Sequence, residues 1–303
     1  MSQEMLQIEA RNKSHKSEKF TLNLYRFFVY VVLIIMAITC LFPFYIMLVN
    51  CTRTNVEIQR EVSFWFGNNF INNLVNLFNN DQVPIASAMK NSLFVATISA
   101  TLTTYFSALT AYATHIYNFK GKKFITTFIM AIMMIPTQVS AIGSLLMYYQ
   151  IQAAIPGLKL LDTFWPLTIP AICAPVTYFY IKQYMDSVLP TEVIEAARVD
   201  GSSEIGIFHR MVLPMIKPAL SVQFIFAFVS NWNNYFFPGL ILTSKNKYTL
   251  PILISQLKSS DPTTFDYGQI YCLMTIVVLP LIIVYFILSK NIIKGLTSGA
   301  VKG

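Results

Sequence analysis

Charged residues are scarce in this 303-residue chain: Asp, Glu, Lys and Arg make up 12% of it, while 55% is hydrophobic and 14% aromatic. Soluble domains usually carry about 25% charged residues, so the composition argues against an ordinary soluble protein. A disordered chain lacks this much apolar material and is excluded as well. The mean hydropathy of +0.54 agrees with these arguments, and we expect an integral membrane protein.

Side chains that carry out chemistry are missing from the apolar parts of the chain. The cysteines Cys40, Cys51, Cys173 and Cys272 are far apart and form no CxxC pair, which argues against a disulfide framework or a zinc site. No GxxxxGK[ST] motif occurs, so no P-loop for ATP is predicted. The six apolar stretches contain no Asp or Glu, although carriers driven by protons or sodium commonly place carboxylates at membrane depth. Any transport against a gradient would therefore draw its energy from a partner.

Six stretches are long and apolar enough to cross a hydrocarbon core as helices, which takes roughly 17–25 residues. They are 27–49, 92–114, 124–149, 164–181, 219–242 and 270–289. Pro166, Pro170 and Pro175 interrupt the fourth, so we expect it to be a broken helix packed inside a bundle, where neighbouring helices or water bond to the freed carbonyls. The predicted fold class is an all-α integral membrane protein with six transmembrane helices.

Positive charge is distributed unevenly between the two sides of this predicted bundle. The net charge is +8, and 15 of the 22 Lys and Arg residues lie in one set of connecting segments against 7 in the other. The positive-inside rule therefore places both termini and the loop 182–218 in the cytoplasm. The expected organisation is a cytoplasmic segment 1–26, a six-span domain 27–293 and a cytoplasmic tail 294–303. The membrane topology explains the net positive charge of the chain, so no nucleic-acid partner is expected.

The cytoplasmic loop reads LPTEVIEAARVDGSSEIGIFHRMVLPMIKPAL over 189–220 and is long for a simple connection. Thr191 is expected to cap a helix that carries Glu195 near its start. Asp200 and Gly201 are expected to end this helix, with the glycine in the left-handed conformation.

A second short helix is expected to follow in the same loop. Ser202 or Ser203 would cap it, and Pro214 and Pro218 would stop it after about Met211. The loop is thus a helix–turn–helix on the cytoplasmic face. An amphipathic loop resting on lipid headgroups is the alternative interpretation.

The segment EAARVDG, followed by LP at 213–214, closely resembles the EAA loop of permease subunits in binding-protein-dependent ABC importers. The matching residues are Glu195, Ala196, Ala197, Asp200, Gly201, Leu213 and Pro214. The resemblance implies that this loop is the coupling helix, which docks into a groove on the ATP-hydrolysing subunit.

The resemblance covers the chain from about residue 25 to its end and points to the carbohydrate branch of the family, which contains the six-span maltose-type permease subunit. Two departures are Asn234, where the branch usually has an acid after Trp-Asn, and Gly143, where it often has proline. The segments that resemble this branch are Phe42-Pro43, Asn91-Ser92-Leu93, 136–139, Trp232-Asn233, 248–251 and 295–303.

The resemblance implies a multi-pass permease subunit in the cell membrane that imports a sugar, specifically an oligosaccharide, at the expense of ATP. The implied partners are a second related permease, two ATP-binding subunits and an extracellular sugar-binding protein. This chain itself is expected to have no catalytic residue, metal or cofactor, because ATP and Mg²⁺ are used by the partner subunits. The tail, with Lys302 and Gly303, is expected to reach the interface of those subunits. An importer of another solute, such as an amino acid or osmolyte, and a secondary carrier or membrane enzyme are the alternatives.

The fifth apolar stretch carries small and polar residues at helical intervals of three or four: Gln223, Ala227, Ser230, Asn231 and Asn234. Uncharged amides and hydroxyls could bind sugar hydroxyls without the desolvation cost of a carboxylate. The polar members Gln223, Ser230, Asn231 and Asn234 are therefore candidates for the substrate path. The same residue types also serve as hydrogen-bonding contacts between membrane helices, and this alternative stays open.

Overall fold

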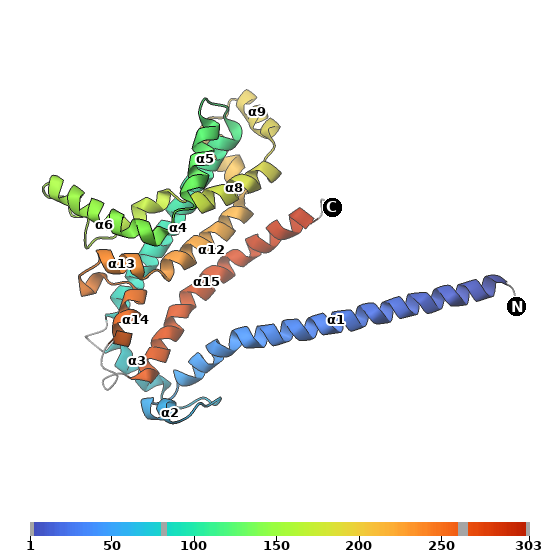
Figure 1. Ribbon diagram of the computed structural model, residues 1–303, viewed down its shortest axis with the longest axis horizontal. Coiled ribbons are helices and arrows are strands. Elements are labelled where there is room, and N and C mark those ends of the chain that lie inside the picture. Colours follow the sequence, from blue (N-terminus) through green and yellow to red (C-terminus); the bar gives the residue numbers. More distant parts are fainter. Residues whose placement is uncertain (1–2, 80–83, 260–265, 301–303) are drawn as a thin grey trace. The chain divides into compact units, whose positions relative to one another are not determined.

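The computed structural model describes residues 3–79, 84–259 and 266–300, and the regular secondary structure in these ranges is entirely helical (Figure 1). The chain divides into two compact units. One contains Met1–Val75 and Asp266–Thr275, and the other contains Asn76–Phe265 and Ile276–Gly303.

The first unit is built on α1 (Gln3–Asn50), which is followed by α2 (Asn55–Arg60) and the start of α3 (Phe70–Phe78). Buried polar side chains fix the turn after α1. Asn73 Nδ2 donates to the carbonyls of Cys51 and Arg53, both at 2.9 Å. The buried Arg53 guanidinium in turn donates to the carbonyls of Glu57 and Glu61. This polar segment is therefore a folded loop that closes the end of an apolar helix.

The second unit is organised around the long helix α4, which packs against α8, η1, α12 and α14 (Figure 1). Its buried positions are mostly Ala, Ser and Thr, and such small side chains let helices in a membrane approach closely. The elements of this unit after α3 are α4 (Ile85–Ile116), α5 (Lys122–Ile132), α6 (Thr137–Ala154), α7 (Trp165–Thr168), η1 (Ile169–Ile172), α8 (Pro175–Val188), α9 (Thr191–Val199), α10 (Glu204–Ile207), η2 (Phe208–Val212), α11 (Leu213–Met215), α12 (Lys217–Trp232), α13 (Phe236–Ile241), η3 (Lys245–Lys247), α14 (Leu250–Ser259) and α15 (Tyr267–Ala300), which begins in the first unit.

Three described helices are long and apolar enough to cross a membrane: Leu22–Asn50 within α1, Ile85–Ile116, and Tyr267–Lys290 within α15. They contain the first, second and sixth predicted spans. The other three predicted spans are divided between shorter helices.

Proline explains the divisions that the sequence analysis did not anticipate in the third and fifth spans. Pro136 lacks the N–H that would bond to the carbonyl of Ile132, and α5 ends at Ile132. Pro238 likewise leaves the Asn234 carbonyl without its helical donor, and the chain is non-helical between α12 and α13. The expectation of unbroken helices at 124–149 and 219–242 was therefore wrong.

The fourth predicted span is broken, as expected, into α7, η1 and α8, and side chains of α4 donate to three of its carbonyls. Pro175 has no N–H for the carbonyl of Ala171, and Thr103 Oγ1 donates to that carbonyl at 2.9 Å. Ser99 and Ser107, one helical turn away on either side, donate to the carbonyls of Leu167 and Ala174 at 3.2 and 3.4 Å. The prediction that a neighbouring helix would bond to the broken segment is confirmed.

Thr103→Val is expected to lower the free energy of unfolding by about 1 kcal/mol, because the substitution keeps the side-chain shape but leaves the Ala171 carbonyl unpaired. Thermal unfolding in detergent would measure this loss. Thr103→Ser retains the hydroxyl and is the matched control. Equal stability of both variants and the wild type would show that the bond contributes nothing.

Candidate coupling loop and polar hollow

The segment matched to the coupling pattern forms α9, and it ends as the sequence predicts. Gly201 has φ +79, the Gly201 N–H donates to the Arg198 carbonyl, and the Ser202 N–H donates to the Ala197 carbonyl, both at 3.0 Å. This is the Schellman arrangement of a helix C-terminus. The expected N-cap was wrong, because Pro190 occupies that position and Thr191 is the first helical residue.

The second helix begins where expected but does not end there. Ser203 Oγ accepts a hydrogen bond from the Gly206 N–H at 3.2 Å, so Ser203 is the N-cap. The helix then continues through η2 and α11 and joins α12 at a bend of 81°. Pro214 does not stop it and lies inside the Glu204–Met215 segment, which ends four residues past the expected Met211. Pro218 has no N–H for the Pro214 carbonyl and follows directly after the break, so its expected effect agrees with the structure.

The residues of the coupling pattern differ in burial. Glu195, Ala196, Asp200 and Gly201 are exposed, whereas Ala197 is only 6% exposed and belongs to the core cluster beneath α9. Of the remaining two, Leu213 is half-buried and Pro214 is exposed. One face of α9 thus anchors the loop, and the opposite face is available to a partner.

Two apolar residues on this surface were missed by the sequence analysis. Val199 is 89% exposed and Ile205 is 73% exposed, although both lie beside charged residues. Single exposed apolar side chains are common on protein surfaces, so it is their place beside the exposed residues of the coupling pattern that makes these two candidates for a partner contact. The signal in the sequence was their position within the matched segment, next to Asp200 and Glu204. A groove of about 270 Å³ lies in the same loop, lined by Ser202, Ser203, Gly206, Ile207, Arg210 and Met211.

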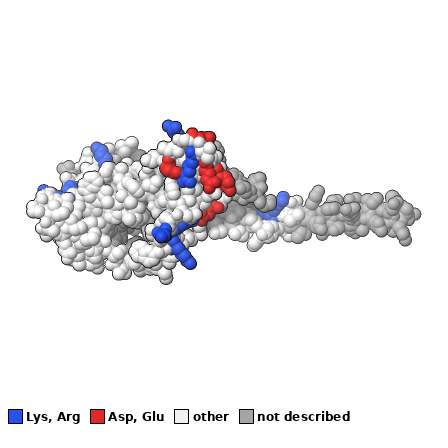
Figure 2. All heavy atoms as spheres, turned by 90° about the horizontal axis from the view of Figure 1, so that it is seen from above, with Lys and Arg blue, Asp and Glu red and all other residues white. Residues whose placement is uncertain are grey.

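Charge also collects near this loop. Figure 2 looks from above Figure 1, where α9 lies, and shows Lys, Arg, Asp and Glu gathered in one region of a face that is otherwise mostly uncharged. The Arg198 guanidinium donates to Glu204 through Nε at 2.6 Å and through its second terminal nitrogen at 3.3 Å. First this arginine and then the Tyr117 hydroxyl lower the pKa of Glu204 to about 2, which keeps the carboxylate ionised.

A polar hollow of about 490 Å³ is formed by α6, η1, α12 and the start of α13. It brings together two residues of the predicted stripe, Ser230 and Asn234, with polar residues of α6 that the sequence analysis did not single out. The lining residues are Gln138, Ser140, Ala141, Ser144, Pro170, Ser230, Asn234, Phe236 and Phe237. Hydroxyls, amides and two aromatic rings make this surface suitable for an uncharged polar solute.

The other two polar residues of the predicted stripe do not line this hollow. Gln223 is only 6% exposed within α12. Asn231 Nδ2 donates to the Ala227 carbonyl of its own helix at 2.8 Å. The stripe therefore splits into a half that faces the hollow and a half that stabilises the helix or its packing.

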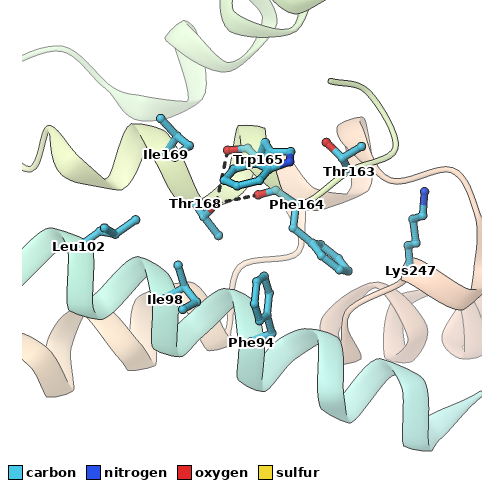
Figure 3. A pocket seen from close by; sticks show the side chains of 9 residues that line it. All are labelled: Phe94, Ile98, Leu102, Thr163, Phe164, Trp165, Thr168, Ile169 and Lys247. Carbon is cyan, nitrogen blue, oxygen red and sulfur yellow. Dashed lines mark hydrogen bonds between the residues drawn. The ribbon is translucent and has the colours of Figure 1, made fainter. Parts of the chain in front are cut away.

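A larger cavity of about 560 Å³ lies between α4 and α7 and is mainly apolar (Figure 3). Its hydroxyl at Thr168 donates to the carbonyls of Phe164 and Trp165. Lys247 is paired with Asp162 at 2.9 Å. The remaining lining is almost entirely apolar: Phe94, Ile98, Leu102, Thr163, Phe164, Trp165 and Ile169. This cavity offers few groups to a hydrophilic solute, so the smaller hollow is the better candidate.

Asp162 joins the segment before α7 to the segment after α13. Its carboxylate accepts bonds from the N–H groups of Thr243 and Ser244, from the Ser244 hydroxyl and from Lys247 Nζ. Burial opposes ionisation, but the bonds from Ser244, Lys247 and Thr243 together outweigh it and hold the pKa of Asp162 below its usual value. The Asp162 carboxylate therefore fixes this end of the second unit. The end that carries α9 is likewise fixed by a charged group, the Glu204 carboxylate that binds Arg198.

Comparison with known proteins gives matches over most of the chain. The family described as "Binding-protein-dependent transport system inner membrane component" matches residues 103–298. The arabinooligosaccharides transport system permease protein AraQ of Bacillus subtilis (strain 168) is 31% identical over 291 residues, which cover 93% of this chain and 97% of that protein. The lactose transport system permease protein LacG of Rhizobium radiobacter is 28% identical over 273 residues, covering 90% and 95%.

The fold is shared with a solved structure. A chain in the crystal structure of a bacterial ABC transporter involved in the import of the acidic polysaccharide alginate superposes with a TM-score of 0.76 at 18% identity, over 88% of this chain and 96% of that one. The family match over more than half of the chain, and the relative that is 31% identical over nearly its whole length, agree with the coupling pattern in α9. The chain belongs to the family of inner membrane components of binding-protein-dependent transport systems.

Proposed function

We propose that this chain is the permease subunit of an ATP-driven importer of oligosaccharides and forms half of the translocation path. The observation that carries the proposal is the coupling pattern, which lies within the family match and whose residues Glu195 and Ala196 on α9, followed by Asp200 and Gly201, are exposed. Relatives named for arabinooligosaccharide and lactose transport support a sugar as the cargo.

The exposed face of α9 is proposed as the contact with the ATP-binding subunits. Glu195, Ala196, Asp200 and Gly201 would enter a groove on that subunit, with Val199 and Ile205 supplying the apolar part of the contact. Leu213 and Pro214 would hold the end of the loop. ATP and Mg²⁺ would bind to the two ATP-binding subunits. One of these subunits would contact this chain, and the other would contact the second, related permease.

The polar hollow is proposed as this subunit's part of the substrate path. Ser230 and Asn234 would bind sugar hydroxyls together with the polar residues of α6. None of the described residues that line the hollow is acidic, and a neutral lining suits a neutral cargo because no carboxylate has to be desolvated. An extracellular binding protein would deliver the sugar to the end of the unit that carries Asp162.

The proposed topology has six spans with both termini in the cytoplasm. Three spans would be single helices and three would be broken segments packed on α4 or beside it. Broken helices are tolerated at membrane depth where protein surrounds them or where they line a cavity. The polar hollow, which lies between α6, η1 and α12, meets this condition.

Reconstitution tests the function directly. The chain, its related permease and the ATPase subunits would be placed in proteoliposomes with the binding protein outside, and uptake of radiolabelled oligosaccharides would be measured. We expect uptake that requires ATP inside the vesicle and is insensitive to proton or sodium ionophores. Uptake abolished by ionophores, or uptake without the ATPase subunits, would instead identify a secondary carrier.

Lys302 and Gly303, at the end of the tail 294–303, lie outside the described residues. We propose that they contact the ATPase pair. Deleting 296–303 removes no apolar core, so insertion of the spans is expected to survive. Stimulated ATP hydrolysis by the truncated complex is expected to fall. Wild-type hydrolysis after the deletion would show that the tail makes no functional contact.

A further inference from the structure

The region between the coupling surface and the rest of the second unit contains a group of four side chains that the proposed function does not use. Glu204 Oε2 accepts a hydrogen bond from the Tyr112 hydroxyl at 3.1 Å and another from the Tyr117 hydroxyl. The same carboxylate accepts both bonds from Arg198. The Arg198 guanidinium also lies over the Tyr117 ring, 5.4 Å from its centroid. We call these four residues the clamp.

The clamp joins three elements. Arg198 belongs to the last turn of α9, Glu204 starts α10, and Tyr112 and Tyr117 lie at the end of α4. The end of α8, which two residues separate from α9, is tied to the same end of α4, because His115 contacts the Leu189 carbonyl through Nε2 at 3.0 Å and Asp186 through Nδ1 at 2.6 Å. The clamp therefore attaches the last turn of α9 to α4, and the chain that leads into α9 is held to α4 by His115.

The clamp does not occupy the exposed face assigned to the ATPase subunits. Arg198 and Glu204 have side chains 35% and 43% exposed and turn toward the tyrosines, whereas Glu195 and Val199 lie on the open face of α9. Isolated ion pairs at this exposure contribute little to stability. The additional tyrosine bonds and the ring contact make a network with one preferred geometry, which suits a positioning role better than a stabilising one.

We propose that Glu204 is a positioning residue of the transport cycle: by holding Arg198 and the hydroxyls of Tyr112 and Tyr117, it makes α9 and α4 move as one body. This proposal rests on the proposed function of α9. A displacement imposed on α9 by the ATPase subunits passes through Glu204 to α4. Because α4 packs along α12, the displacement reaches the helix that carries Ser230 and leads directly into Asn234.

Glu204→Gln tests this, because it retains the shape of the side chain and removes its charge. In the complete complex we expect Glu204→Gln to capture the ATPase subunits as the wild type does and to continue to hydrolyse ATP. The amount of sugar moved per ATP hydrolysed is expected to fall at least about threefold. Tyr117→Phe retains the ring contact and should give a smaller loss in the same direction. The matched control is Tyr184→Phe, which removes a hydroxyl of α8 that bonds to none of the described residues.

A double-mutant cycle adds a result that misfolding would not give. If Arg198 and Glu204 act as a unit, Arg198→Gln combined with Glu204→Gln loses no more coupling than either change alone. Additive losses would overturn the proposal, as would unchanged sugar per ATP in Glu204→Gln while Glu195→Lys still releases the ATPase subunits. Wild-type capture in Glu195→Lys would overturn the coupling surface, and the clamp with it.

Discussion

Gly201→Val is expected to reduce oligosaccharide uptake on the order of tenfold while leaving the membrane-spanning helices inserted. Gly201 has φ +79, where a β-branched side chain is strained, and no other atom lies within 4 Å of an added Cβ. The cost is therefore one of backbone conformation rather than of collision. Relief of this strain would unwind the Schellman turn and change the angle between α9 and α10.

Capture of the ATPase subunits and sugar uptake, measured on one preparation, would check this result. Gly201→Asn is the conservative control, because asparagine tolerates the left-handed region better than other residues. Gly157→Val applies the same strain at φ +85, also in open space but between α6 and α7. Equal losses for Gly157→Val and Gly201→Val would point to general destabilisation and against a role of α9 in coupling.

Asn234→Leu is expected to reduce uptake by about tenfold through loss of a polar group in the hollow. Asn231→Leu, three residues earlier, is the matched control because its amide bonds to its own helix. We expect a much smaller effect there, with assembly of the complex unchanged in both variants. Saturation curves would show whether the Asn234 variant has an increased KM.

The pair also separates the two roles that the sequence left open for the polar stripe. Equal losses of uptake would mean that the stripe acts through helix packing. Wild-type uptake by Asn234→Leu would exclude the hollow as a sugar site.

Local signals in the sequence predicted the end of the coupling helix at Gly201 and the start of the next helix at Ser203, but not the N-cap of the coupling helix. The bonds that define these two positions join residues three to five positions apart, so a short segment contains the information needed. Pro214 was misjudged, because the segment passes it after the π-helical turn η2 and ends only at Met215, before Pro218. Which proline coincides with the end of a helix depends on how the loop joins α12.

The polar hollow could be predicted only in part. Ser230 and Asn234 follow from helical spacing within one segment, but the polar residues of α6 reach them only through tertiary packing. Likewise, Glu204 is separated from Tyr112 by 92 positions in the chain. No pattern within a single segment indicates such a partner, so the clamp could be found only in the folded protein.

The Glu204–Met215 segment and Lys217–Trp232 meet at a bend of 81° and form the two arms of an angled lever that turns about this bend. A push along the first arm turns the second arm about the bend instead of sliding it along its own axis. The second arm has 16 residues and is therefore about 24 Å long. A rotation of about 5° would sweep its far end sideways by about 2 Å. Ser230 is near that far end, so a small displacement of the Glu204–Met215 segment is enough to change the width of the hollow.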